Sequence, residues 1–250
     1  MTRDGRLPEL LAPAGSPEAL RAAVEGGADA VYFGASGFNA RAGARNFSDT
    51  ELRRAVEFCH GRGVRVYLTL NTLIYDRELR DYLAAAETAY LAGVDALIVA
   101  DIGGAAALRR TFPDLPLHAS TQMSGHSVGC AKELASLGFE RMVLAREMSF
   151  ADIAGFTRTS PIEAEVFIHG ALCVCHSGQC LFSSMVGGRS GNRGECAQPC
   201  RLPYNGGKYP LSLKDNCLAG HIPELIDAHV ASLKIEGRMK GPDYVGPVTA

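Results

Sequence analysis

The chain has 250 residues, of which 47% are hydrophobic and 21% are charged, and its formal net charge is −2. This is the composition of an ordinary globular protein, and the length suffices for one sizeable core. The near-neutral charge gives no general signal for binding a polyanion, so a nucleic-acid contact would need a local basic patch.

The N-terminal residues contain no apolar run of signal-peptide length, and nowhere do eighteen apolar residues occur together. We therefore expect a cytoplasmic protein with no membrane span. In that reducing compartment, closely spaced cysteines serve more often as metal ligands or redox groups than as structural disulfides.

Short apolar runs alternate with amphipathic helical patterns along the chain. The runs predict eight strands, at residues 10–15, 30–34, 64–71, 96–101, 115–120, 141–146, 164–170 and 232–238. Between most of them lie helical stretches, and Ser16, Asp49 and Asp76 are placed to cap helix starts. Strands that alternate with helices indicate a parallel sheet.

A weak repeat links the second, fourth, sixth and eighth strands, which all follow a helix end and a short turn, as in EGGADAVYFG and LAGVDALIVA. Paired units of this kind close into a TIM-like (β/α)8 barrel, here a single domain across residues 1–250. An open doubly wound sheet is the competing fold, but no GxGxxG motif follows the first strand. We therefore favour the barrel.

Alternation along the strands predicts which side chains fill the barrel. Outer faces must meet apolar helices, so Lys234, Glu236 and Arg238 should point inward, and so should residues on three other strands, namely Tyr67, Thr69, Asn71, His118, Ser120, Gln122, Glu165, Phe167 and His169. An unpartnered buried polar group costs about 1 to 3 kcal/mol. We expect a polar ligand or water among them, unless Lys234, Glu165 and Glu236 pair with one another at the barrel floor.

Active sites of this fold lie at the C-terminal ends of the strands. Five inward-facing residues belong to those ends and are the candidate catalytic residues, namely Asn71, Gln122, His169, Glu236 and Arg238. Of these, His169 or Glu236 is predicted to move protons.

Five of the eight cysteines fall between residues 170 and 200, directly after the seventh strand. A loop of roughly forty residues needs a cross-link to stay ordered, and thiolates suit zinc or an iron–sulfur cluster. No CxxC pair occurs here, which disfavours zinc without excluding it. Of the other three, Cys217 follows beyond the loop, and Cys59 and Cys130 lie in helical patterns and are predicted to be small core residues.

Several long motifs, EVFIHGALCVCHSGQC, RSGNRGECAQPCR, SLKDNC and SLKIEGRMK, resemble the signature of the peptidase U32 family, also called collagenase-like proteases. The resemblance covers essentially the whole chain and implies oxygen-independent hydroxylation of a tRNA uridine, a 23S rRNA cytidine or a ubiquinone precursor. For the RNA-modifying branches it also implies prephenate as a partner. Longer members continue past the end of this sequence, so we expect a C-terminal region to be lacking.

The resemblance further implies a 4Fe–4S cluster held by a cysteine-rich insertion, residues 171–217. The family's ligand positions fall on Cys173, Cys180, Cys196 and Cys217. Cys175 and Cys200 are left over, and Cys200 is the stronger rival for a ligand position. His176 stands where many members have tyrosine.

A donor such as prephenate carries carboxylates, which the planar fork of arginine binds in a bidentate manner. We predict Arg41, Arg193 and Arg238 for this role, with Lys234 and His118 as further substrate-binding residues.

Two other functions compete with hydroxylation. Proteolysis would need a nucleophile with a base or a zinc motif, and neither is readable, since Ser127 of GHSVG falls in a helical pattern. The other alternative is a non-catalytic binding or assembly subunit in which zinc or a cluster only cross-links the loop.

Overall fold

The computed structural model describes residues 7–41 and 43–250. Sequence analysis predicts no signal peptide at the N-terminus, and residues 1–6 of that region lie outside the described residues. Eight parallel strands close into a barrel: β1 (Glu9–Pro13), β2 (Ala30–Gly34), β3 (Arg65–Leu70), β4 (Ala96–Val99), β5 (Leu117–Ala119), β6 (Phe139–Val143), β7 (Glu163–Gly170) and β9 (Ser232–Ile235). Because β9 pairs with both β1 and β7, the sheet has no open edge within the barrel, and the predicted TIM-like barrel is confirmed.

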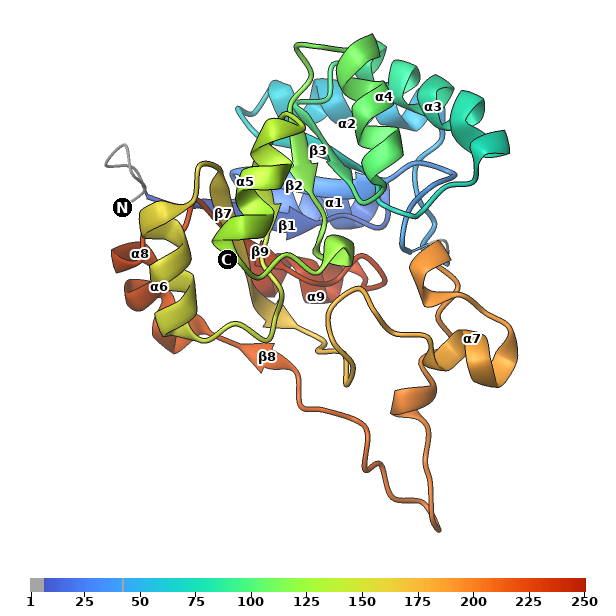
Figure 1. The fold of residues 1–250 in the computed structure, drawn as a ribbon, viewed down its shortest axis with the longest axis vertical. Coiled ribbons are helices and arrows are strands. Elements are labelled where there is room, and N and C mark those ends of the chain that lie inside the picture. The colour runs from blue at the N-terminus through green and yellow to red at the C-terminus, as the bar shows by residue number, and fades with distance from the viewer. Residues whose placement is uncertain (1–6, 42) are drawn as a thin grey trace.

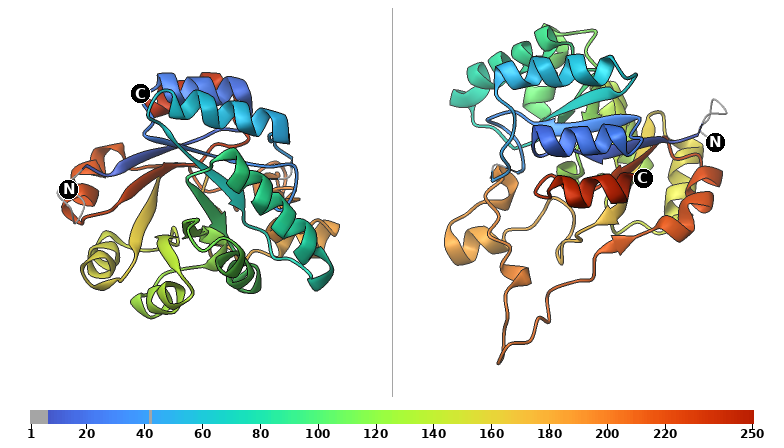
Figure 2. Two further views of the ribbon diagram at one scale, coloured as in Figure 1. Left: turned by 90° about the horizontal axis from the view of Figure 1, so that it is seen from above. Right: turned by 180° about the vertical axis from the view of Figure 1, so that it is seen from behind.

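Helices surround the strands, as Figures 1 and 2 show. They are α1 (Pro17–Glu25), α2 (Asp49–His60), α3 (Leu79–Ala92), α4 (Ile102–Thr111), α5 (Val128–Ser136), α6 (Phe150–Thr159), α8 (Ile222–Asp227) and α9 (Pro242–Thr249). None of the described helices combines the length and the hydrophobicity that crossing a bilayer requires.

Helix caps are only partly as predicted. The Ser16 side chain accepts from the Ala19 amide and caps α1, as predicted. The cap of α2 is Ser48 and not Asp49, because Ser48 has the extended backbone a cap requires while Asp49 is already helical. Asp76 begins a 3-10 turn that precedes α3 and caps neither element.

The strand faces follow the predicted alternation. Six outward side chains are buried in the main core together with apolar residues of the surrounding helices, namely Leu68, Leu70, Val166, Ile168, Leu233 and Ile235. Cys59 on α2 is fully buried in this core, as predicted, and burial raises the pKa of its thiol to about 12. Cys130 is partly buried and packs against the same core.

A network of ion pairs fills the lower part of the barrel. Lys234 Nζ donates to Glu165 Oε1 at 2.7 Å, and Arg141 Nη1 donates to Glu9 Oε1 at 2.7 Å. Tyr67 Oη donates to Glu9 Oε2 at 2.6 Å. Lys234 and Glu165 therefore pair at the floor as one alternative had it, while Glu236 takes no part in that pairing.

His118 lies in the same lower region, beside the ring of Tyr67 at 4.9 Å between centroids. It lines a separate cavity of about 230 Å³ together with Arg65, Arg141 and Glu163. Burial and three nearby cations, Arg141, Lys234 and Arg65, hold the pKa of His118 well below its usual value.

Residues 171–217, called the cysteine segment below, leave the barrel where β7 ends. The segment contains α7 (Phe182–Gly187), two 3-10 turns (Gly191–Arg193 and Pro199–Arg201) and β8 (Asn216–Cys217). β8 pairs antiparallel with the end of β7, so that Cys217 lies opposite His169. Figure 1 shows the stretch that leads to β8 projecting away from the barrel.

Candidate active site at the barrel mouth

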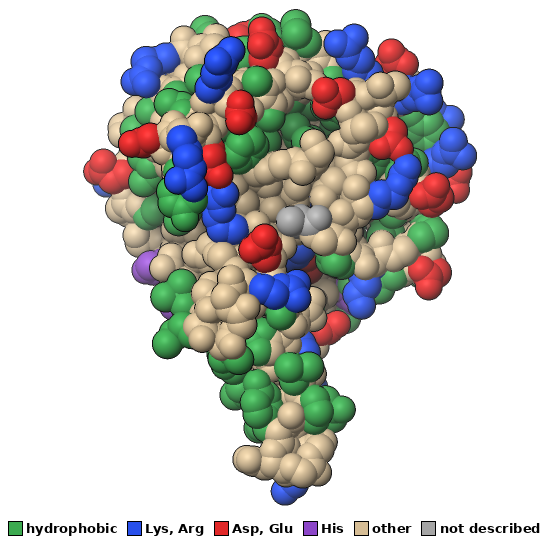
Figure 3. Space-filling view, turned by 90° about the vertical axis from the view of Figure 1, so that its right-hand side faces the viewer, with side chains coloured by type: hydrophobic (Ala, Val, Ile, Leu, Met, Phe, Trp, Pro, Cys, Tyr) green, Lys and Arg blue, Asp and Glu red, His purple; other side chains and the backbone are tan. Residues whose placement is uncertain are grey.

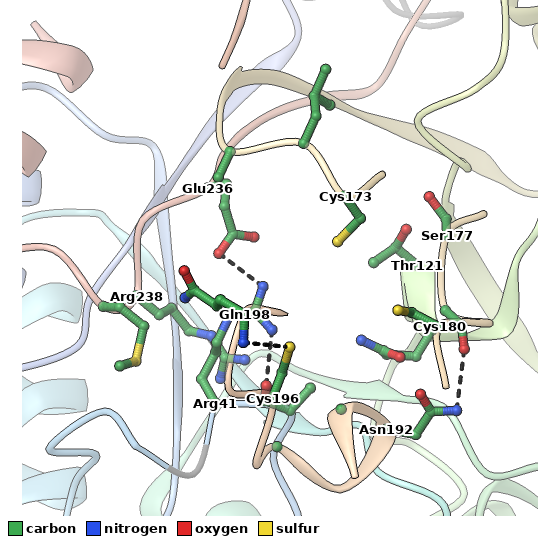
Figure 4. A pocket seen from close by; sticks show the side chains of 18 of the residues that line it. Arg41, Thr121, Cys173, Ser177, Cys180, Asn192, Cys196, Gln198, Glu236 and Arg238 are labelled. Carbon is green, nitrogen blue, oxygen red and sulfur yellow. Dashed lines mark hydrogen bonds and ion pairs between the residues drawn. The ribbon is translucent and has the colours of Figure 1, made fainter. Parts of the chain in front are cut away.

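A cavity of about 620 Å³ opens where the barrel strands end, and the cysteine segment forms one side of it. Figure 4 shows residues from both parts facing this space. Its lining includes ten residues used below, namely Arg41, Asn71, Gln122, Arg146, Cys173, Cys180, Cys196, Cys200, Glu236 and Arg238. The candidate site predicted at the C-terminal ends of the strands is thus a hollow in which charged and polar side chains lie among apolar wall residues.

Two arginines hold the carboxylate of Glu236. Arg41 Nη2 donates to Glu236 Oε1 at 3.2 Å, and Arg146 Nη2 donates to Glu236 Oε2 at 3.1 Å. Burial alone would raise the pKa of Glu236, but the neighbouring guanidinium groups outweigh it and bring the pKa to about 2. With a pKa of about 2 and both oxygens held by arginines, Glu236 is too weak a base to take up a proton readily at neutral pH, which argues against its predicted role in proton transfer.

Arg238 is buried without a carboxylate partner among the described residues. Its guanidinium donates to Thr69 Oγ1 at 2.7 Å and to Asn39 Oδ1 at 3.4 Å, which are both neutral acceptors. Burial and the charge of Arg41 lower the pKa of Arg238 to about 10. With Arg41, Arg146 and Glu236, the group holds three positive charges and one negative, and so favours an anion.

Arg146 was not among the predicted site residues. It lies just after β6, and its guanidinium packs over the Phe167 ring at 4.0 Å from the centroid. The alternation that selected Gln122 would not have found Arg146, because Arg146 has the same parity as Met142 and Leu144, which lie in the outer core.

Asn71 and Gln122 both line the cavity, as predicted, but they differ in what holds them. The Asn71 side chain accepts from the Ala40 amide at 2.9 Å and donates to Ser120 Oγ at 3.1 Å, so it connects two loops. The Gln122 side chain makes no hydrogen bond to any described residue, and it is therefore the one of the two that can turn toward a ligand.

Three predicted residues lie elsewhere. His169 is absent from the cavity lining, and its Nδ1 lies 3.0 Å from Tyr244 Oη. Arg193 binds Glu78 at 2.6 Å and the Leu73 carbonyl at 2.7 Å, so it ties the cysteine segment to the start of α3. His118 belongs to the barrel floor. These positions argue against proton transfer by His169 and against substrate binding by Arg193 and His118 at the mouth.

Lys234 reaches the bottom of the cavity but is neutralised by Glu165. To contact substrate as predicted, Lys234 would have to bind the substrate and Glu165 at the same time.

The cysteines divide into two groups by position. Cys173, Cys180 and Cys196 line the cavity (Figure 4), and Cys200 lines it with them. Cys217 is exposed on β8 outside the lining. Cys175 is likewise outside it.

The thiols of the cavity fit a soft metal centre in their chemistry. All are free, and Cys196 Sγ accepts a hydrogen bond from the Gln198 amide at 3.4 Å, the kind of contact that orients a metal ligand. Burial raises the pKa of Cys180 and Cys200, and neighbouring thiols add to the effect. Among the residues that the structure describes, no three or more His, Cys, Asp or Glu side chains are already arranged to hold a metal ion.

A closed (β/α)8 barrel with a cavity that carries charged side chains at the C-terminal ends of its strands is the arrangement of barrel enzymes. The solved structure of the U32 peptidase Mk0906 has the same fold, with a TM-score of 0.64 over 95% of this chain and 96% of that one, at 15% identity. The family model of peptidase family U32 matches residues 15–250, and the chain belongs to this family.

Several relatives carry names that describe RNA modification. The chain is 44% identical to a 23S rRNA 5-hydroxycytidine synthase of Escherichia coli, covering 100% of this chain and 39% of the relative. It is 38% identical to tRNA hydroxylation protein P1 of Bacillus subtilis, covering 97% and 61%. A relative named collagenase, from Porphyromonas gingivalis, is 35% identical, covering 95% and 62%. The chain thus spans between about two fifths and three fifths of these relatives' lengths.

Proposed function

We propose that this chain carries out the oxygen-independent hydroxylation of an RNA base, in tRNA or 23S rRNA, with a prephenate-like carboxylate as donor. The observation that carries the proposal is that cysteines and an arginine cluster line the same cavity. The names of the RNA-modifying relatives support the choice of substrate.

The donor would bind at the arginines. Arg238 has no carboxylate partner among the described residues, and Arg41 and Arg146 share the single carboxylate of Glu236. A carboxylate that enters here gains charge-assisted hydrogen bonds without displacing an ion pair of Arg238. Gln122 is available to orient the neutral part of the ligand.

A 4Fe–4S cluster would be held by Cys173, Cys180, Cys196 and Cys217. The first three line the cavity, and Cys217 lies opposite His169, which precedes Cys173 by four residues. Cys200 is the rival for the fourth position, because it shares the cavity with the other three. Such a cluster would supply electron transfer beside the donor site, and a zinc ion is the alternative occupant.

The chain's own residues would do the remaining work. The ionised Glu236 keeps Arg41 and Arg146 aligned toward the cavity, and Phe167 supports Arg146 from below. Asn71 fixes the loop that carries Arg41 through the Ala40 amide. The cysteine segment covers one side of the cavity and limits the access of water.

The experiment is deletion of the gene in its host, followed by mass spectrometry of tRNA and rRNA nucleosides. Loss of one hydroxylated nucleoside, restored by the wild-type gene and not by an Arg238→Gln variant, supports the proposal. An unchanged nucleoside profile refutes it. Anaerobically purified protein should be brown and contain iron and sulfide, whereas a colourless protein with one zinc would refute the cluster.

Proteolysis is the second candidate, because a relative is named collagenase. In this chain the serine of GHSVG caps α5: Ser127 Oγ accepts from the Cys130 amide at 3.2 Å. That position differs from the strand-to-helix turn that exposes a serine nucleophile in hydrolases. Hydrolysis of collagen or casein that survives Ser127→Ala and removal of trace proteases would favour this candidate.

A further inference from the structure

The cysteine segment exposes large apolar side chains on α7, which adjoins the cavity, and on the stretch that projects from the barrel (Figure 1). On α7, Met185 is 83% and Val186 is 70% exposed, and Tyr209 on the projecting stretch is 58% exposed. Figure 3 shows hydrophobic side chains spread over the part of the molecule that protrudes below the barrel. Several large apolar side chains exposed along one segment mark an interaction surface more often than scattered single ones do.

The same segment is the basic part of an acidic chain. Residues 171–217 contain five Arg and Lys against Glu195 and Asp215, a formal charge of +3, while the whole chain has −2. The rest of the chain therefore carries −5. Lys208 and Lys214 are exposed and form no ion pair with any described residue, and Arg189 uses only its Nε, toward the Glu195 carbonyl.

We propose that the surface formed by residues 181–214 docks a single-stranded stretch of the substrate RNA beside the barrel mouth. This inference rests on the proposed function and adds the place where the RNA lies. A base that reacts inside a cavity of about 620 Å³ has to leave its stack, so its neighbours lie unstacked on the rim. Exposed tyrosine and aliphatic side chains then meet base faces, while lysines meet phosphates.

The sign of the charge selects RNA over other occupants. Lys208 directly precedes the exposed Tyr209, and neither Lys208 nor Lys214 is ion-paired within the described part of the chain. Such cations combined with an exposed aromatic ring are what single-strand binding surfaces use. A purely apolar partner would not require cations, and a duplex would cover its base faces and leave Tyr209 without a stacking partner.

The test measures fluorescence anisotropy of labelled single-stranded RNA and of the matched duplex with the full chain, purified anaerobically. The variant Lys208→Ala/Lys214→Ala should bind the single strand about tenfold more weakly, and the slope of log affinity against log salt should fall by about 1.4. The charge-matched control Arg110→Ala/Arg158→Ala changes exposed arginines in the last turns of α4 and α6, at the opposite ends of those helices from the mouth, and should change neither quantity.

Stacking is tested separately. Tyr209→Ala should weaken single-strand binding by about tenfold, whereas Tyr209→Phe, which keeps the ring, should bind as the wild type does. Iron content and circular dichroism of each variant verify that the cysteine segment is still folded.

The outcomes separate this inference from the proposed function. If Lys208→Ala/Lys214→Ala and Tyr209→Ala bind and hydroxylate RNA as the wild type does, the proposed docking surface is wrong while the proposed hydroxylase activity stands. The same holds if the duplex binds more tightly than the single strand. If the variants weaken binding but gene deletion leaves every hydroxylated nucleoside in place, the surface stands and the proposed reaction is wrong.

Discussion

The guanidinium of Arg238 donates to the Thr69 hydroxyl at 2.7 Å and meets no carboxylate among the described residues. A buried cation with only neutral partners is costly unless a ligand supplies the missing charge. Arg238 is therefore the residue at which loss of activity and loss of stability should separate most clearly.

We expect Arg238→Gln to lower kcat/KM for RNA hydroxylation about 10- to 100-fold, because a charge-assisted hydrogen bond to the donor disappears. Stability should not fall, since the variant removes an uncompensated buried charge. Urea unfolding and nucleoside mass spectrometry measure the two effects. Arg45→Gln, on the exposed ion pair with Glu51, is the control and should change neither. A variant that unfolds easily but keeps its activity would contradict the anion site.

The carboxylate of Glu236 makes stability depend on pH. Its pKa is about 2 in the folded protein against an ordinary value of 4.5, so its contribution is complete above pH 4.5 and is lost as the pH falls toward 2. The difference corresponds to about 3 kcal/mol. Glu236→Gln should remove this part of the pH dependence, as measured by urea unfolding at several pH values. Equal slopes for the two proteins between pH 4.5 and 2 would contradict it.

The fourth cluster ligand can be decided by two single variants. We expect Cys217→Ser to lose iron and visible absorbance, and Cys200→Ser to keep both, after anaerobic purification. Cys130→Ser, on α5 away from the cysteine segment, is the control and should retain a full cluster. If Cys200→Ser loses iron and Cys217→Ser keeps it, the fourth ligand is Cys200 and not Cys217.

The barrel floor should respond as one unit. Lys234→Met leaves the fully buried Glu165 with only the longer contact to Arg141 at 3.4 Å, and should destabilise the protein by about 3 to 5 kcal/mol. The double variant Lys234→Met/Glu165→Gln should recover part of that loss. A double-mutant cycle in urea measures the coupling, and additive effects would show that the pair does not interact.

The barrel could be predicted from the sequence because the alternation of the strands and the amphipathic pattern of the helices are both explicit in it. Alternation placed Leu233 and Ile235 outward and Lys234 inward, and the structure confirms all three. The same periodicity cannot tell how far along the barrel axis an inward side chain lies. His118 and Gln122 were grouped on one strand, yet one reaches the floor and the other the mouth.

Site roles were less predictable, because they depend on partners distant in sequence. The sequence predicts Arg193 as a carboxylate ligand of the donor, but Glu78, 115 residues away, already occupies its guanidinium. It predicts Glu236 as a proton carrier, but Arg41 and Arg146 hold the two oxygens of its carboxylate. Charge compensation of this kind is a property of the folded chain and leaves no local signature.

The ion-paired floor of the barrel also bears on the order in which the two proposed substrates would bind at the mouth. The floor cavity and the mouth cavity share no lining residue. Among the described residues, the arginine cluster is therefore reached through the mouth. An RNA strand lying across that entrance would block the passage of a small molecule. Under the proposed function, the small carboxylate would therefore bind before the RNA and its remnant would leave after the RNA, a compulsory order that product-inhibition kinetics can detect.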